Sequence, residues 1–331
     1  MDVFMASILG MGNALVDIMT RLDSDDILDT FLLPKGSMQL VDDAFSRRVE
    51  GETAGLERIL TSGGSAANTI HGLANLGIRA GYIGMVGNDQ FAELFEEDLI
   101  ENNIEPRLLR GKSSTGRAMA LISPDSERTF ATYLGAAIEM DHLDLEPHHL
   151  DGYRHFYIEG YLVQNRKLMQ KALQLAKEKD MTISLDLASY NVAAENREFL
   201  LDMIGKYVDI LFANEDEALA VTGMQPGEAI SHLGAISRIV VVKLGEQGSM
   251  AMNGGSIFMI SPVASNAIDT TGAGDLYASG FLYGLIRGYD ITRCGEIASK
   301  VAGRITEIIG PKFDKKTWED LRFAIGAHDD R

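Results

Sequence analysis

The segment Asp269-Thr-Thr-Gly-Ala-Gly-Asp275 combines residue types that suit a phosphate-handling site. It leads into a stretch of helical periodicity, so backbone N–H groups around Gly272 and Gly274 can converge where the helix dipole is positive. Asp275 then lies beside a site for negative charge, where a carboxylate is useful if it removes a proton from an incoming hydroxyl. This combination indicates phosphoryl transfer to an alcohol. The alternative is that Asp275 caps the helix and the glycines only shape a turn.

A second glycine-rich turn, Ser62-Gly-Gly-Ser-Ala-Ala-Asn68, also opens a predicted helix. Gly63 and Gly64 allow a ligand to lie against the backbone. Asn68 offers both a donor and an acceptor, which suits vicinal hydroxyl groups. The alternative is a tight strand-to-helix turn that Asn68 caps.

A third candidate, Asn214-Glu-Asp-Glu217, follows a strand expected to end near residue 212. Polar residues at the carboxyl end of a strand line the ligand crevice of an open α/β sheet. Their oxygen atoms can hold the water shell of Mg²⁺. The alternative is an acidic helix start that the helix dipole favours.

The elements that would position these motifs alternate between short apolar runs and helix-period segments. This alternation predicts a mostly parallel sheet with helices on both faces. The expected strands lie at residues 7–9, 82–86, 155–158, 182–185, 210–212 and 239–243. The expected helices lie at residues 68–76, 168–179, 199–204, 216–221, 276–286, 297–308 and 318–323.

Two apolar, β-rich segments, 27–42 and 118–134, break this pattern because no helical segment is expected beside them. Within the second, Ala118–Ile122 and Thr129–Leu134 flank a Ser-Pro-Asp-Ser-Glu turn, which predicts a hairpin. These strands are expected to form a small sheet set apart from the main body. One α/β domain spanning residues 1–331 with a β appendage fits the pattern.

Composition excludes several classes of protein. The 331 residues carry 30 Lys and Arg against 48 Asp and Glu, a net charge of −18, so nucleic acid and membranes are not expected as partners. A single cysteine, Cys294, and no basic N-terminal region or membrane-length apolar run favour a cytoplasmic location. There is no P-loop motif, and Gly10-Met-Gly12 lacks the third glycine of a dinucleotide-binding fingerprint because Leu15 occupies that position.

Taken together and in order, the three motifs resemble the ribokinase-like (PfkB) family of carbohydrate and nucleoside kinases. The resemblance covers nearly the whole chain from residue 10, with one departure: Ile70 stands where a small residue is common. It implies a ribokinase-like three-layer α/β/α domain with a mostly parallel central sheet. It also implies a small β-sheet lid, contributed by residues of about 14–43 and 113–136.

Within the family, residues 12–17, 127–136, 157–161 and 184–190 are most similar to adenosine kinases. The resemblance implies ATP-dependent phosphorylation of the 5′-hydroxyl of a nucleoside, adenosine first, which yields AMP as in purine salvage. A sugar or sugar-acid kinase of the same family is the alternative, followed by a non-catalytic nucleotide-binding regulator. ATP and Mg²⁺ are the implied cofactors, while a need for K⁺ and the choice between monomer and homodimer stay open.

The resemblance also implies roles for matching residues. Asp275 is the expected base, the N–H groups of Gly272, Ala273 and Gly274 form an anion hole, and Arg128 of the lid closes on the transferring phosphate. For Arg128 the alternative is a solvated surface residue. The implied acceptor-binding residues are Asn13, Asp17, Gln39, Gly63, Gly64, Asn68, Leu134, Tyr161 and Tyr190. The implied nucleotide-binding residues are Asn214, Lys243, Gly245, Gly248 and Thr270, with Glu217 near Mg²⁺ through water.

Overall fold

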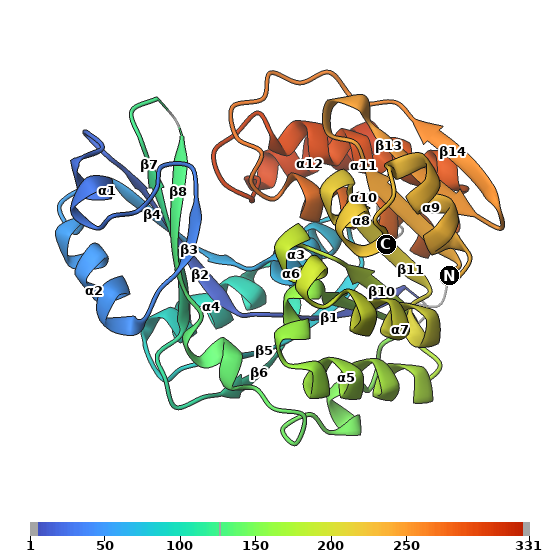
Figure 1. The fold of residues 1–331 in the computed structure, drawn as a ribbon, viewed down its shortest axis with the longest axis horizontal. Helices are drawn as coiled ribbons and strands as arrows, with labels where there is room; N and C mark the ends of the chain where they lie inside the picture. The colour runs from blue at the N-terminus through green and yellow to red at the C-terminus, as the bar shows by residue number, and fades with distance from the viewer. Residues whose placement is uncertain (1–5, 126, 327–331) are drawn as a thin grey trace.

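A nine-stranded sheet forms the centre of the main body in the computed structural model, which describes residues 6–125 and 127–326 (Figure 1). Its strands, in spatial order, are β14 (Ser256–Ile260), β13 (Ser249–Asn253), β12 (Ile239–Lys243), β11 (Ile210–Asn214), β10 (Thr182–Asp186), β9 (His155–Glu159), β1 (Ser7–Met11), β5 (Arg79–Val86) and β6 (Ile104–Arg110). Strands β12 to β6 run parallel, and β13 and β14 are antiparallel. The predicted mostly parallel sheet is confirmed.

Helices cover both faces of this sheet, because its central strands are apolar on both sides. Phe212 of β11 belongs to one buried core and its neighbour Leu211 to the other. The first core is completed by α3 (Ser65–Asn75), α4 (Gln90–Glu101), α10 (Ala273–Ile286), α11 (Ile291–Ile305) and α12 (Lys315–Ile325). The second is completed by α5 (Arg166–Glu178), α6 (Tyr190–Glu195), α7 (Arg197–Tyr207), α8 (Glu215–Thr222) and α9 (Pro226–Gly234). This is the predicted three-layer α/β/α fold.

A smaller five-stranded sheet, sheet B, lies to one side of the main body, at the left of Figure 1. Its order is β3 (Met38–Leu40), β8 (Arg128–Tyr133), β7 (Gly116–Ile122), β2 (Leu15–Arg21) and β4 (Arg58–Gly63). Strands β7 and β8 form the expected antiparallel hairpin. The strand β4 lies outside the two segments from which lid strands were predicted.

The expectation that residues 27–42 would be entirely β-rich is wrong. The structure places helix α1 (Asp26–Thr30) there, and β3 is only three residues long. Ile27, Leu28 and Phe31 have the spacing of one helical face, and Leu28 and Phe31 are buried. The run also lies close to helix α2 (Asp43–Glu52) in sequence, and Phe31 packs edge-on against Phe45 of that helix.

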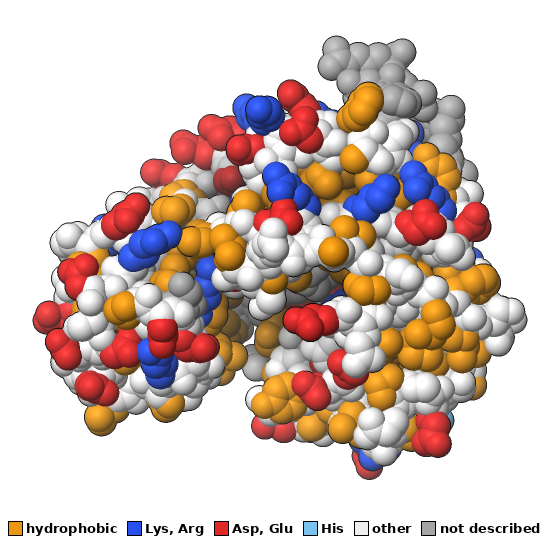
Figure 2. Space-filling model, turned by 90° about the horizontal axis from the view of Figure 1, so that it is seen from above, with side chains coloured by type: hydrophobic (Ala, Val, Ile, Leu, Met, Phe, Trp, Pro, Cys, Tyr) orange, Lys and Arg blue, Asp and Glu red, His pale blue; other side chains and the backbone are white. Residues whose placement is uncertain are grey.

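The two sheets join where β1 continues into β2 and where β4 continues into α3. At this junction Gly64 has φ +97°, and a Cβ at this position would lie 2.3 Å from the carbonyl oxygen of Asn13. Only glycine permits this close crossing of the two segments. In the space-filling view, the lobe that carries sheet B is separated from the main body by a hollow (Figure 2). No helix in the described ranges has the length and apolar character needed to cross a membrane.

Helices α10 and α11 approach closely at glycine positions, and this contact generates a stability prediction. A Cβ on Gly280 would lie 2.7 Å from the Cα of Ala298, which is backbone and cannot move aside cheaply. We expect Gly280→Ala to lower the free energy of unfolding by about 1–3 kcal/mol through overpacking, despite the better helix propensity of alanine.

Urea unfolding measures this change, and Gly51→Ala is the matched control. A Cβ on Gly51 of α2 meets nothing within 4 Å, so that variant should be unchanged or stabilised by up to ~1 kcal/mol. Equal stability of the two variants would contradict the close helix contact.

Candidate active site

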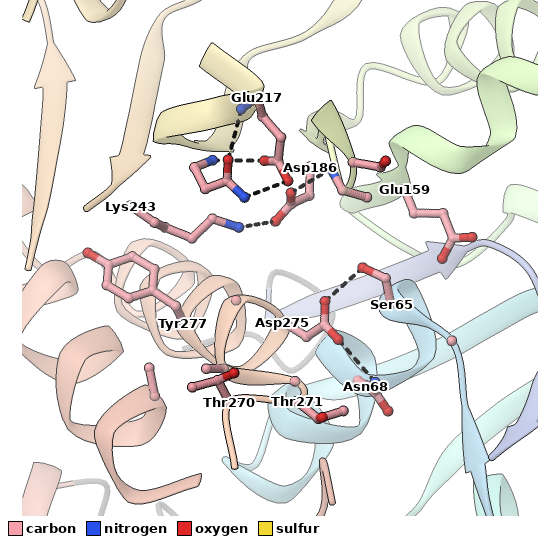
Figure 3. A pocket seen from close by; sticks show the side chains of 18 of the residues that line it. Ser65, Asn68, Glu159, Asp186, Glu217, Lys243, Thr270, Thr271, Asp275 and Tyr277 are labelled. Atoms are coloured by element: carbon pink, nitrogen blue, oxygen red, sulfur yellow. Dashed lines mark hydrogen bonds and ion pairs between the residues drawn. The ribbon is translucent and has the colours of Figure 1, made fainter. Parts of the chain in front are cut away.

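A cavity of about 1410 Å³ lies at the carboxyl ends of the parallel strands, between the main body and sheet B. Both halves of the chain line it: Asp17 comes from β2, Asp186 from β10, Lys243 from β12 and Asp275 from α10. Such a position is where open α/β sheets bind ligands. Figure 3 shows these side chains, Asp17 apart, converging around the first turn of α10.

The carboxylate of Asp275 is held by the first turn of another helix, α3. Its Oδ1 accepts a hydrogen bond from the Ser65 hydroxyl at 2.7 Å, and its Oδ2 accepts one from Nδ2 of Asn68 at 3.0 Å. Burial raises the pKa of Asp275 to about 7, against the lowering effect of these two donors. A carboxyl group with this pKa can take up a proton near neutral pH.

Asn68 therefore contacts the predicted base, and its Oδ1 stays buried without a hydrogen-bond partner. A buried amide oxygen without a partner is costly unless a ligand hydroxyl or water satisfies it. Ser65 was not predicted as a site residue. Its place inside the glycine-rich turn, where a hydroxyl precedes the predicted helix 68–76, is the signal that could have indicated it.

The segment Asp269–Asp275, called the signature turn below, has the backbone conformation that an anion hole needs. Gly272 has φ +76° at the start of α10, and no side chain caps the helix there. The side chain of Pro311 packs on this glycine, since a Cβ on Gly272 would lie 2.6 Å from it. The N–H of Ala273 already donates to the carbonyl of Thr270 at 3.1 Å, so Ala273 fits the predicted anion hole less well than the glycines.

Arg128 reaches from β8 of sheet B to this signature turn. Its Nη1 donates to the Thr271 hydroxyl at 2.6 Å, and its Nη2 forms an ion pair with Asp269 at 2.6 Å. The Arg128 side chain is only 12% exposed, so the alternative that it is a solvated surface residue is wrong. Its closing on a phosphate stays a prediction.

Lys243 brings a positive charge to the first turn of α10. Its Nζ lies 2.9 Å from Oδ2 of Asp186 and 3.2 Å from the position that a Cβ on Gly274 would take. Burial opposes the charge, but Asp186 and Glu217 outweigh it and raise the pKa of the Lys243 ammonium above its ordinary value. Asp186 was not predicted, although a carboxylate at the end of a strand could have indicated it.

Asn214 and Glu217 cap the start of α8 reciprocally. Asn214 accepts from the Glu217 N–H at 2.8 Å, and Glu217 accepts from the Asn214 N–H at 2.8 Å, so the acidic helix start is part of their role. Burial raises the pKa of Glu217 to about 7. Within the described part of the chain, no three His, Cys, Asp or Glu side chains are arranged to bind a metal ion directly. A hydrated Mg²⁺ held through water by Glu217 and Asp186 fits this acidic end of the cavity.

A second unpredicted carboxylate, Glu159, fixes the junction of the two sheets. Its Oε1 accepts from the N–H of Asn13 and its Oε2 from the N–H of Ala66, both at 2.9 Å. Burial raises its pKa to about 7. Glu159 thus holds together the two segments that carry Asp17 and Asn68. Within the segment 157–161, the resemblance implied a role for Tyr161 alone, and the two backbone donors of Glu159 lie 146 and 93 residues away in sequence.

Most of the predicted acceptor-binding residues lie at the cavity. It is lined by Asn13, Asp17, Gly64, Asn68, Leu134 and Tyr161. Gly63 lies behind Asp17, because a Cβ there would be 2.3 Å from the Asp17 carboxylate. All the predicted nucleotide-binding residues line the other part: Asn214, Lys243, Gly245, Gly248 and Thr270. What each residue binds stays a prediction.

Besides Gly63, two of the predicted acceptor contacts, Gln39 and Tyr190, are absent from the residues that line the cavity. On β3 the side chains alternate, so Met38 and Leu40 face the cavity, whereas the Gln39 amide donates to the Ser37 hydroxyl instead. Tyr190 begins α6 and is 53% exposed. A positive φ of 62° at Ala188 turns the chain before it.

Comparisons with known proteins identify the family of this chain. The pfkB family of carbohydrate kinases matches residues 39–317. A 5-dehydro-2-deoxygluconokinase of Clostridium botulinum is 28% identical over 278 residues, which cover 78% of this chain and 82% of that protein.

Two solved structures have the same fold over almost their whole length. An adenosine kinase from Sinorhizobium meliloti superposes with a TM-score of 0.86 and 31% identity, covering 96% of this chain and 99% of the other. A probable sugar kinase from Rhizobium etli superposes with a TM-score of 0.87 and 30% identity, covering 97% and 99%. The chain therefore belongs to the pfkB family of carbohydrate kinases, and it is a phosphotransferase that acts on an alcohol group.

Proposed function

We propose that this enzyme transfers the γ-phosphoryl group of ATP to the 5′-hydroxyl of a nucleoside, adenosine first. The observation that carries the proposal is the position of Asp275, held by Ser65 and Asn68 at the same turn as the glycine N–H groups. A hydroxyl that contacts this carboxylate would lie next to a phosphate bound at the turn, as in-line transfer requires.

An apolar wall favours a nucleoside over a free sugar as the acceptor. Sheet B contributes apolar side chains to the cavity beyond Asp17: Leu15, Met38, Leu40, Ala118 and Phe130. A purine base needs flat apolar surroundings, whereas a free sugar needs mainly polar groups. Asp17, which lines the cavity, would accept hydrogen bonds from the ribose diol.

In the proposed reaction, Asp275 takes the proton of the 5′-hydroxyl while the hydroxyl oxygen forms a bond to the γ-phosphorus. The bond from this phosphorus to the bridging oxygen breaks, and ADP leaves with that electron pair. The N–H groups of Gly272 and Gly274, with the ammonium of Lys243, stabilise the negative charge that develops. Arg128 would exchange Asp269 for the phosphate when sheet B closes over the substrates.

Mg²⁺, when bound, neutralises charge on the ATP phosphates. Glu217 and Asp186 are the residues that would hold it, through water. Both line the part of the cavity that also contains the predicted nucleotide-binding residues.

A sugar or sugar-acid kinase is the second candidate. The similarity to a 5-dehydro-2-deoxygluconokinase and to a probable sugar kinase favours it. Its catalytic end would be identical, because the arrangement around Asp275 does not depend on what carries the hydroxyl.

Kinetics with different acceptors decide between these candidates. We expect kcat/KM for adenosine to exceed that for ribose or fructose at least ~10²-fold, a difference of about 2.7 kcal/mol in transition-state binding. Adenosine has a purine base that can pack against the apolar wall, whereas a free sugar has none. Coupled assays of ADP release measure these values. Comparable turnover of a free sugar would overturn the nucleoside assignment and leave the kinase intact.

The role of Asp275 is tested by Asp275→Asn. The amide cannot take up the proton, so kcat should fall ~10²–10⁴-fold while the Kd of adenosine, measured by calorimetry, changes little. In the wild type, kcat should rise with pH through about 7, because the base must be ionised and burial raises its pKa to about 7.

Asp314→Asn is the matched control, since Asp314 is an exposed cap of α12 that does not line the cavity, and asparagine caps equally well. Retention of more than about a tenth of wild-type kcat by Asp275→Asn would show that another group removes the proton.

A further inference from the structure

Lys312 is a largely buried lysine that none of the motifs includes. It follows α11, and its side chain is only 13% exposed. Its Nζ forms an ion pair with Oδ2 of Asp98 in α4 at 2.6 Å and donates to the hydroxyl of Ser62 in β4. The Ser62 hydroxyl in turn donates to Asp98 at 2.5 Å. Each of the three groups therefore contacts the other two, and this set joins three distant parts of the sequence.

The loop that carries Lys312 also contacts the signature turn. The N–H of Gly310 donates to Asp269 at 2.6 Å, and Pro311 packs on Gly272. Consecutive residues of this loop thus hold the signature turn, and the next residue along, Lys312, holds β4.

At its other end, the set includes Ser62, whose neighbour Gly63 packs against the carboxylate of Asp17. Ser62 precedes Gly63, and a Cβ on Gly63 would lie 2.3 Å from the Asp17 carboxylate. Burial raises the pKa of Asp17 to about 7, and the positive charge of Lys312 acts against this increase.

The other neighbours of Asp17 contribute no comparable charge. Across the sheet, its partners are Thr61 on β4 and Ala118 on β7, and both are uncharged. His71 is neutral at physiological pH, because burial lowers its pKa to about 3 and the positive charge of Lys312 acts in the same direction. Asp98 is already paired with Lys312.

The strength of the fold alone does not explain this arrangement. Removing a lysine from water is costly, and apolar side chains of similar volume often replace a buried ion pair without loss of stability. A buried charge near a ligand cavity is a candidate for a functional role.

We propose that Lys312 is a positioning residue of the acceptor site. Lys312 holds β4, which lies behind Asp17, at a fixed distance from the signature turn. Its ammonium group also stabilises the carboxylate form of Asp17. The inference rests on the proposed function in one respect: Asp17 is taken to bind the acceptor hydroxyls, which the carboxylate does better than the neutral acid.

The test combines Lys312→Met with the double variant Lys312→Met/Asp98→Asn, which leaves no unpaired charge if the single variant folds poorly. Carbon-13 NMR of the side-chain carboxyls measures the pKa of Asp17, whose resonance is assigned by its loss in Asp17→Asn. Both variants should raise this pKa from about 7 to about 8 or above, because the stabilising charge is lost.

Acceptor binding should change in step with this pKa. At pH 7 the ionised fraction of Asp17 then falls from about one half to about one tenth, so the affinity for adenosine should fall about fivefold. The defect should shrink as the pH rises above 8, since Asp17 ionises again. Calorimetry measures the affinity. Lys315→Met, at an exposed lysine three residues along, is the matched control and should resemble the wild type.

An unchanged pKa of Asp17 in both variants would reduce Lys312 to a structural link and overturn the proposal. A raised pKa with unaltered, pH-independent adenosine affinity would also overturn it, because Asp17 would then not act on the acceptor. If the wild type binds neither nucleosides nor sugars, the proposed function fails, while the NMR titration still decides whether the ammonium acts on Asp17.

Discussion

The hydrogen bonds from Ser65 and Asn68 to Asp275 are the interaction on which the candidate site depends. They join the first turns of α3 and α10, two helices that begin about 200 residues apart in the sequence. Each helix start is itself fixed from outside: Glu159 holds the first turn of α3, and Pro311 packs on the turn before α10. In the proposed function, the acceptor hydroxyl and the phosphate are thereby brought to one carboxylate.

The electrostatics of the cavity follow from this burial. Four carboxyl groups around it have pKa values raised to about 7 by removal from water: Asp17, Glu159, Glu217 and Asp275. In an acidic chain, the anionic cosubstrate of the proposed reaction needs local positive potential. The proposal assigns this role to Lys243, to the start of α10 and, once it leaves Asp269, to Arg128. The same low-dielectric surroundings strengthen these interactions when a substrate excludes water.

Motifs whose chemistry is local in sequence could be predicted. The glycines of the signature turn and the strand–helix alternation identified the fold, the cavity and the placement of Asp275. Contacts that depend on tertiary packing could not, as Ser65, Glu159 and Lys312 show, because their partners lie far away along the chain. The predictions for Gln39 and Tyr190 were wrong for a local reason. Strand alternation turns Gln39 away from the cavity, and a turn at Ala188 precedes the exposed Tyr190.

The central claim, that the phosphoryl group passes directly and in line from ATP to the acceptor hydroxyl, is tested most directly by the stereochemistry at phosphorus. ATP made chiral at its γ-phosphorus with oxygen isotopes and sulfur is turned over with adenosine, and the configuration of the product is determined by phosphorus-31 NMR. A single in-line displacement inverts the configuration, and inversion is the predicted result. Retention would mean that the phosphoryl group passes through a covalent enzyme intermediate, and it would contradict the account.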